Sequence, residues 1–342
     1  MGKTNAGRFF EDYKLGEVIE HAVPRTVGAG ERAIYHALYP ARHAISSSDE
    51  FAKSCGLAKS PLDELIAFHM VFGKTVPDIS LNAVANLGYG EARWLAPVWQ
   101  GDTLRSVSEV IGLKQNSSGK TGVVWVRTKG INQCDETVLE YVRWVMVKKH
   151  DHRLEAPETT IPKLSGVVPA GQLIIPKGLD FSNYNFTLSG EPHRLPDYSI
   201  GEKIDHVDGV TIEEAEHMLA TRMWQNTAKV HFDTSSRPDG RRLIYGGHII
   251  SLARALSFNG LANAQMMVGL NAGNHANPCF AGDTVRAWSE VLDISNTNSL
   301  GVGLIRLRTV ATKGAPFKLR DEQGKYLPDV LLDIDYWAVM PI

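Results

Sequence analysis

Residues 196–212, PDYSIGEKIDHVDGVTI, decide the fold, because residues 11–27, EDYKLGEVIEHAVPRTV, repeat them. A fixed repeat of this kind indicates that the chain contains two copies of one structural unit. The identical positions, which all align at a single offset, are Asp12 with Asp197, Tyr13 with Tyr198, Gly16 with Gly201, Glu17 with Glu202, Ile19 with Ile204, His21 with His206, and Thr26 with Thr211.

Two further blocks extend the repeat in the same order along the chain. The first runs from Pro97 to Val110 and matches Pro278 to Val291, and the second matches GVVWVR at 122–127 with GLIRLR at 303–308. Three ordered blocks at nearly constant spacing predict a tandem duplication. We therefore expect one repeat over 1–150, a proline-rich linker over 151–191 and a second repeat over 192–342.

Each copy follows the same pattern of elements. A β-rich segment comes first (18–27 and 203–212), and one long apolar helix follows (61–74 and 248–261). Segments of alternating character come next, namely 103–113, 122–131 and 138–148 in the first copy, which is typical of strands. One helix followed by several strands predicts an α+β fold, with an antiparallel sheet wrapped around a central helix. Residues 313–326 of the second copy are rich in Lys, Gly and Asp and are expected to form a surface loop.

The composition is that of a water-soluble globular protein. Hydrophobic residues make up 43% and charged residues 22% of the 342 positions, and the net charge is −2. This charge favours neither nucleic acid nor an anionic membrane as a partner, and no apolar run reaches the ~18 residues of a membrane span. The N-terminal residues lack the apolar stretch of a secretory signal. The three cysteines have no metal-site spacing, so reduced thiols in a cytoplasm are expected.

Chemically capable residues gather between 223 and 252, MWQNTAKVHFDTSSRPDGRRLIYGGHIISL. Asn226 and His231 lie on an expected irregular turn, and Gly246-Gly247 begin the second long helix. Glycines at a helix start let backbone N–H groups approach a ligand oxygen, where the helix dipole adds positive charge. A histidine beside such a site could move protons on a carbon next to a carbonyl. A turn with a surface histidine is the alternative.

The two copies differ in these residues. Under the offset of the first block, Asn226 falls on Ala41, His231 on Ser46, Asp233 on Ser48 and Gly247 on Leu62. The chemically capable groups of the second copy thus have plain counterparts in the first. The sequence predicts one site per chain, carried by the second repeat, with the first repeat shaping the pocket.

This pattern resembles the MaoC-like double hot-dog hydratases, the (R)-enoyl-CoA hydratase group. Their Asp-x-Asn-Pro-x-His motif supplies a carboxylate and a histidine around the attacking water, and a glycine N–H at the helix start binds the thioester oxygen. His231 matches the histidine and Gly247 the glycine, whereas Asn226 replaces the Asp. Longer strings resemble this family over nearly the whole chain: FGKTVPDISLNA, VIGLKQNSSGKTGVVWV, VLEYVRWVMVKK, GEKIDHVDGVTIEEAEHM, QNTAKVHF and YGGHIISLARALSFNGLANA.

The resemblance implies a tandem hot-dog fold and reversible hydration of a short, branched enoyl-CoA that carries a free carboxylate. It implies no metal or redox cofactor, coenzyme A being part of the substrate, and a homodimer in the cytoplasm. His231 would act as acid and base, Asn226 would orient water, and the Gly247 N–H would stabilise the oxyanion. An amide cannot act as a base, so the two-residue scheme of the family cannot transfer unchanged. We interpret Asn226 as avoiding charge repulsion with the substrate carboxylate; stabilising a left-handed turn is the alternative.

Other residues are candidates for substrate contact, each with a structural alternative. For the substrate carboxylate the candidates are Arg42, Arg93 and Arg222, any of which could instead be a solvated or ion-paired surface residue. Tyr245 and His248 could line the pocket, although capping or core packing suits His248, and Asp233 could anchor the turn or fix the imidazole tautomer. For the CoA phosphates the candidates are Lys229, Arg237, Arg241 and Arg242, which could equally form a solvated loop.

Three other functions remain open at this point. A hot-dog thioesterase commonly activates water with a carboxylate over the helix start, and neither copy has one there. A broad-range (R)-enoyl-CoA hydratase would need a long apolar tunnel. An acyl-CoA-binding module would keep the pocket but have no activity. Mutation of His231 would then leave turnover unaffected, because there is none.

Overall fold

The computed structural model describes residues 3–342, and its strands form one antiparallel sheet. The first repeat supplies five strands and the helices that precede or separate them. These elements are η1 (Phe10–Asp12), β1 (Val18–Thr26), α1 (Ala29–Leu38), α2 (Ala44–Ser47), α3 (Asp49–Ser54), α4 (Glu64–Thr75), the π-helical turn η2 (Val76–Ser80), β2 (Ala83–Trp94), β3 (Thr103–Gln115), β4 (Thr121–Ile131) and β5 (Thr137–Lys148).

The second repeat has the same succession of strands. Its elements, with those of the linker, are η3 (Ala170–Gln172), α5 (Phe186–Ser189), η4 (Leu195–Asp197), β6 (Lys203–Thr211), α6 (Glu214–Met223), η5 (Lys229–His231), η6 (Thr234–Ser236), α7 (Gly246–Leu256), α8 (Phe258–Leu261), β7 (Met266–His275), β8 (Thr284–Asn296), β9 (Val302–Thr312) and β10 (Val330–Pro341). None of the helices described over 3–342 is long and apolar enough to cross a membrane.

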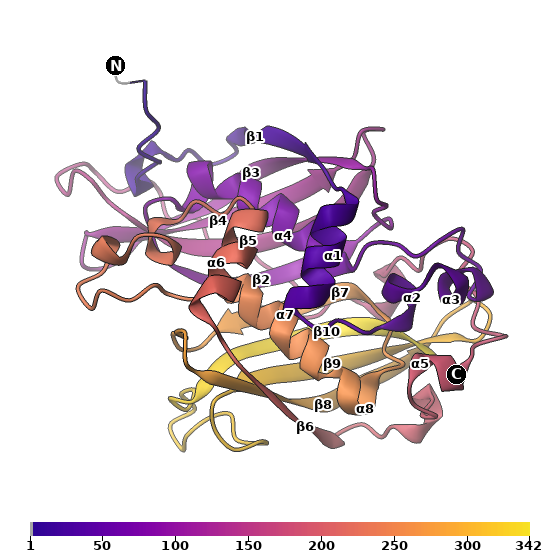
Figure 1. Ribbon diagram of the computed structural model, residues 1–342. Coiled ribbons are helices and arrows are strands. Elements are labelled where there is room, and N and C mark those ends of the chain that lie inside the picture. Colours follow the sequence, from indigo (N-terminus) through magenta and orange to yellow (C-terminus); the bar gives the residue numbers. More distant parts are fainter. Residues whose placement is uncertain (1–2) are drawn as a thin grey trace.

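The strand order is β1-β3-β4-β5-β2-β7-β10-β9-β8-β6, so the second half mirrors the first. The halves join through β2 and β7, where Tyr89 pairs with Gly273 and Arg93 with Gly269. Figure 1 shows α4 and α7 lying side by side across this sheet. The expected α+β architecture, a sheet curved around a central helix in each repeat, is confirmed.

The two long helices are buried because they pack between the sheet and the shorter helices. Every residue of α4 is buried, and so is every residue of α7 after Gly246. Helix α4 begins later than predicted because the Asp63 side chain caps it, accepting from the N–H of Leu65 at 2.9 Å. Helix α7 begins at Gly246, two residues before the predicted start, and ends at Leu256, where the predicted helix continued to 261.

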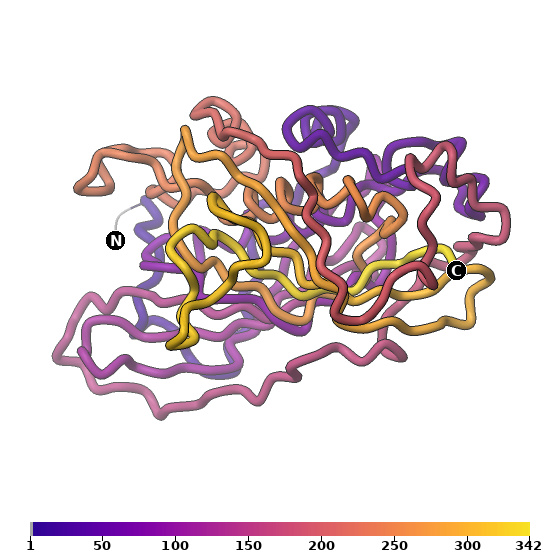
Figure 2. The backbone as a smooth tube through the Cα atoms, turned by 90° about the horizontal axis from the view of Figure 1, so that it is seen from below, coloured from indigo at the N-terminus to yellow at the C-terminus, as the bar shows by residue number. Residues whose placement is uncertain are grey.

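The segment 151–191 crosses the sheet on the face away from α4 and α7 (Figure 2). Thr160 pairs with Leu113 of β3, and the indole of Trp337 in β10 donates to the Val168 carbonyl at 3.1 Å. Apolar side chains of the segment pack against β7 and β10, among them Leu173 and Phe181. The segment therefore closes the outer core. Residues 313–326, between β9 and β10, form the expected loop.

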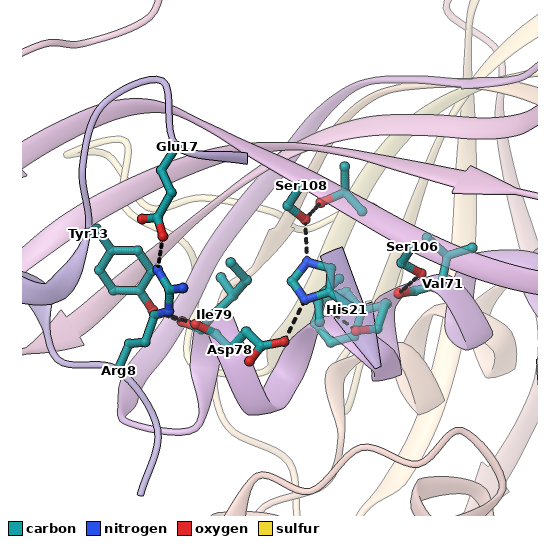
Figure 3. Close-up of polar contacts among 12 residues, drawn as sticks. Arg8, Tyr13, Glu17, His21, Val71, Asp78, Ile79, Ser106 and Ser108 are labelled. Carbon is teal, nitrogen blue, oxygen red and sulfur yellow. Dashed lines mark hydrogen bonds and ion pairs between the residues drawn. The ribbon is translucent and has the colours of Figure 1, made fainter. Parts of the chain in front are cut away.

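A histidine at equivalent positions ties the first strand of each repeat to the sheet. His21 hydrogen-bonds Asp78 and Ser108, both at 2.8 Å (Figure 3). His206 likewise hydrogen-bonds the Asn259 carbonyl at 2.7 Å and Ser289 at 2.8 Å. Burial lowers the pKa of His206 to about 4, so this imidazole is neutral at pH 7. These two repeated histidines are structural, as the repeat indicates.

Candidate active site

A cavity of about 300 Å³ lies where the start of α7 faces the strands of the first repeat. Its walls come from both halves of the chain, and its interior is mainly apolar. The polar residues on its walls are Ser80, Asn86, Tyr89, Arg143, Asn226, His231, Tyr245, His275 and Asn277. A mainly apolar cavity with a few converging polar groups is typical of a small-molecule site.

The tautomer of His231 is fixed by the loop that follows it. Its Nδ1 lies 2.7 Å from the carbonyl oxygen of Leu243, which can only accept, so Nδ1 carries the proton. The lone pair of Nε2 is then free on the other side of the ring, and the ring lines the cavity. Burial is the main cause that lowers the pKa of His231 to about 4. At neutral pH this arrangement gives an uncharged imidazole able to take a proton from water.

Asn226 lies on the same wall, just after α6. Its Oδ1 accepts from the N–H of Ala228 at 3.1 Å, which forms the turn that leads to His231. Within residues 3–342 its Nδ2 has no hydrogen-bond partner, so this group is available to a molecule in the cavity. Gly73 of α4 allows the segment to lie this deep, because a Cβ there would come within 1.8 Å of the Trp224 carbonyl oxygen. Asn226 therefore both shapes the turn and presents an amide to the cavity.

The helix start presents two glycines to this region. Gly246 lines the cavity, whereas Gly247, which the sequence singled out, does not. A Cβ on Gly246 would lie 2.4 Å from the ring of His275, so only glycine fits there. Both residues belong to the first turn of α7, whose N–H groups have no partner within the helix. The helix start can thus stabilise a negatively charged oxygen.

The polar cavity residues that were not predicted from the sequence include Asn86, Tyr89, Arg143 and His275. Tyr89 pairs directly with Arg143 across β2 and β5, and its hydroxyl lies 3.2 Å from Nε2 of His275. Burial lowers the pKa of His275 to about 4. A signal for Arg143 was present in the sequence, because Leu139, Tyr141, Val145 and Val147 place it at an inward position of β5.

None of the three arginines predicted to hold the substrate carboxylate lines the cavity. Arg42 is exposed, with its guanidinium 4.3 Å from the centre of the Phe258 ring. Arg93 is ion-paired with Glu140, its Nε lying 3.2 Å from the carboxylate. Arg222 is exposed on α6. Arg42 and Arg222 flank the matched positions Ala41 and Asn226 along the chain, but this did not place either side chain on the cavity wall.

The residues expected to flank the helix start have separate roles. Tyr245 is buried and lines the cavity, with its ring centre 5.9 Å from that of His231. His248 faces away from the cavity and hydrogen-bonds the hydroxyl of Tyr39 at 3.0 Å. Asp233 caps the turn at 234–236 by accepting from the N–H of Ser235 at 2.9 Å. The Leu243 carbonyl, and not Asp233, therefore fixes the tautomer of His231.

The predicted basic residues lie in η5 and in the segment between η5 and α7. Lys229 is exposed, and Arg237 pairs with Asp239 at 2.7 Å. Arg241 lies 3.9 Å over the Phe280 ring, and Arg242 donates to the Phe232 carbonyl at 2.9 Å. Their sequence neighbours Val230 and Leu243 line the cavity, but none of the four basic residues does.

The equivalent place in the first repeat is nearly filled. A cavity of about 20 Å³ remains there, lined by Leu62 and Glu64 among others. Ser46, the counterpart of His231, is buried and donates to the His43 carbonyl at 3.1 Å. The carboxylate of Glu64 accepts from the N–H of Met267 at 2.7 Å, so it holds the strand junction. A space this small has no room for an acyl group.

Fold and site together define a MaoC-like double hot-dog protein with one site in the second repeat. A MaoC domain dehydratase of Chloroflexus aurantiacus has the same structure, with a TM-score of 0.97 and 55% identity, over 100% of this chain and 99% of that one. A Mycobacterium tuberculosis protein with a double hotdog fold matches at a TM-score of 0.75 and 21% identity over 98% of both chains, a likeness of fold alone.

The family model described as mesaconyl-CoA hydratase matches residues 2–316, and the chain belongs to this family. It is 73% identical to the mesaconyl-CoA hydratase of Cereibacter sphaeroides over 99% of both chains. It is also 56% identical to the beta-methylmalyl-CoA dehydratase of Chloroflexus aurantiacus, over 99% of this chain and 98% of that one. The protein is an enzyme of the hydratase and dehydratase class, a hydro-lyase.

The lowered pKa of His231 predicts that kcat/KM falls only at an unusually low pH. We expect kcat/KM for hydration to stay level from pH 7 to about 5 and to fall near pH 4, where the buried imidazole gains a proton and can no longer act as a base. An unshifted histidine would place this fall near pH 6.5. The measurement is initial rate at low substrate concentration against pH.

Stability needs a parallel check, because folding lowers the pKa of several buried histidines. Their neutral forms favour the folded state above a pH of about 6.5, and this contribution is lost as the pH falls toward 4. Circular dichroism at each pH identifies the range in which the protein is folded. A fall in kcat/KM centred near pH 6.5 within that range would contradict the lowered pKa of His231.

Proposed function

We propose that the enzyme adds water reversibly across the double bond of mesaconyl-C1-CoA, giving β-methylmalyl-CoA. The names of the two relatives support this substrate pair. The observation that carries the proposal is the state of His231, whose Nδ1 is held by the Leu243 carbonyl while its ring faces a cavity bounded by the start of α7. This gives one base, one oxyanion site and one space for the acyl group.

The reaction follows from these positions. Nε2 of His231 takes a proton from water as the water oxygen attacks the β-carbon, and the thioester oxygen gains the negative charge. The N–H of Gly246, which borders the cavity at the helix start, stabilises this oxygen; one such donor contributes about 3–4 kcal/mol to lowering a barrier. The imidazolium of His231 then returns a proton to the α-carbon. The reverse sequence removes water from β-methylmalyl-CoA.

Asn226 orients the attacking water through its free Nδ2 group. In mesaconyl-C1-CoA the attacked carbon carries a carboxylate. An aspartate at 226 would place two like charges close together, which costs about 1 kcal/mol at 4 Å in water and about 4 kcal/mol at an effective dielectric constant of 20. The asparagine thus allows this substrate to approach and leaves His231 to move the proton. Lys229, Arg237, Arg241 and Arg242, which lie close in sequence to the lining residues Val230 and Leu243, are the proposed ligands of the CoA phosphates.

Replacing His231 tests the proposal. We expect His231→Ala to lower kcat for mesaconyl-C1-CoA by about 10²–10⁴-fold, since a positioned acid–base group contributes that much. The enoyl-thioester absorbance gives the rate, with crotonyl-CoA and release of free CoA followed in parallel. His152→Ala, at an exposed histidine, is the matched control and should keep full activity. CoA release without loss of the double bond would indicate a thioesterase, and no turnover by the unmodified enzyme would indicate a binding protein.

Asn226→Asp tests the charge argument separately. The introduced carboxylate should raise KM for mesaconyl-C1-CoA several-fold more than KM for crotonyl-CoA, because only the first substrate carries a negative charge at the attacked carbon. Steady-state kinetics on both thioesters give the two ratios. Equal increases for the two substrates would remove this explanation of Asn226.

A further inference from the structure

We propose that Arg143 binds the free carboxylate of the acyl group and makes the enzyme selective for dicarboxylic acyl-CoA thioesters. This inference rests on the proposed hydration function, because it names the group that recognises the acyl end of that substrate. It replaces the three arginines suggested by the sequence, none of which lines the cavity.

The position of Arg143 is fixed by the strand that carries it. It lies in the middle of β5, and its side chain points to the same inner face as Tyr141 and Val145, since alternate residues of a strand share a face. Its exposed fraction is 0%, yet it is one of the residues that line the cavity. The side chain is therefore shielded from bulk solvent and forms part of the cavity wall.

The guanidinium is only partly satisfied by the protein. Nη2 donates to the hydroxyl of Thr75 at 2.7 Å, and the group lies 4.3 Å from the centre of the Phe72 ring. Nε and Nη1 are buried without a hydrogen-bond partner, and Arg143 forms no ion pair with any residue from 3 to 342. A buried charge that lacks both an opposite charge and hydrogen bonds costs several kcal/mol. An anion in the cavity would supply both.

Other arginines in the core region have their partners within the protein. Arg254 is also buried and lies away from the cavity; its Nη2 donates to the carbonyls of Ala264 and Gln265 and its Nη1 to the hydroxyl of Ser257, so only Nε lacks a partner. Arg306 forms a two-pronged pair with Asp335, at 2.9 and 2.6 Å. Each of these two guanidinium groups has at least two nitrogens paired within the protein. At Arg143 two of the three nitrogens remain available.

A second unsatisfied group lies beside Arg143. Both the Oδ1 and Nδ2 atoms of Asn86 are buried without partners, and Asn86 lines the cavity. In the β2–β5 pairing Asn86 lies opposite Val145, and Tyr89 opposite Arg143, so Asn86 and Arg143 are diagonal neighbours on one face. A guanidinium presents a planar fork that matches a carboxylate, and an amide N–H can add a third hydrogen bond. The chemistry of this corner fits a carboxylate.

Selectivity follows from the cost of leaving these groups unpaired. An acyl group that ends in a methyl would desolvate the guanidinium without replacing its hydrogen bonds, and sites built this way strongly reject the analogue that lacks the polar group. The matched analogue is tiglyl-CoA, in which a methyl takes the place of the C4 carboxylate of mesaconyl-C1-CoA. We expect the unmodified enzyme to prefer mesaconyl-C1-CoA by at least about 100-fold in kcat/KM.

The test compares this preference in Arg143→Met, Arg143→Lys and the unmodified enzyme. Arg143→Met should reduce the ratio of kcat/KM values for the two thioesters at least about 100-fold, with little loss on tiglyl-CoA. Arg143→Lys keeps the charge but loses the fork, so its ratio should be intermediate. Arg127→Met removes an arginine that pairs with Glu91 outside the cavity and should leave the ratio unchanged. Equal losses on both thioesters in Arg143→Met would overturn the inference.

A binding measurement covers the case in which Arg143→Met does not fold. The saturated thioesters 2-methylsuccinyl-C1-CoA and 2-methylbutyryl-CoA cannot be hydrated. The first should raise the unfolding temperature of the unmodified enzyme more than the second, and Arg143→Lys should narrow this difference; equal stabilisation of the unmodified enzyme by both would contradict a carboxylate site. If the unmodified enzyme hydrates neither mesaconyl-C1-CoA nor tiglyl-CoA, the proposed function fails. The binding comparison then still decides the role of Arg143.

Discussion

The hydrogen bond from Nδ1 of His231 to the carbonyl of Leu243 joins the two ends of the loop that leads into α7. It brings the imidazole and the helix start to one wall of the cavity, and it leaves the lone pair on the other nitrogen. Burial then keeps this imidazole neutral at physiological pH by lowering its pKa to about 4. A base that is uncharged, oriented and next to a helix N-terminus is what hydration of a conjugated thioester requires.

The duplication explains why the site needs both repeats although one repeat carries the chemistry. The second repeat supplies His231, Asn226 and the start of α7, and the first supplies Tyr89 and Arg143 from the strands joined to it. The β2–β7 junction makes this possible, since it places the inner faces of both half-sheets around one cavity. In the first repeat the equivalent space is only about 20 Å³. The side chain of Glu64 there accepts a hydrogen bond from the main-chain N–H of Met267.

The sequence predicted the fold, and it pointed to the motif that we propose carries the proton chemistry, because both leave local signals. Repeated blocks gave the duplicated α+β architecture, and the family resemblance gave His231 and Asn226, which the structure brings to one cavity. The acyl-binding end could not be found in the same way. It depends on the register between β5 and β2, and sequence separation of about 50 residues hides the contact between Tyr89 and Arg143. Arg42 and Arg222 were chosen because they lie near the matched positions along the chain. Strand pairing, however, brings together residues that are far apart in sequence.

Helix boundaries show the same limit on a smaller scale. Gly247 was chosen as the helix start, but it is Gly246 that borders the cavity, and the ring of His275 from β7 is what requires a glycine there. Such a requirement arises only when a distant strand packs against the helix. Local propensity places an element within a few residues, and tertiary contacts decide which backbone group faces the substrate.

The most direct test is a crystal structure of the enzyme with 2-methylsuccinyl-C1-CoA bound. The account predicts that the thioester oxygen lies over the first turn of α7, that the β-carbon faces Nε2 of His231, and that the free carboxylate contacts Arg143. An acyl group bound with its β-carbon away from His231, or lying outside the cavity between the start of α7 and β2, would contradict it.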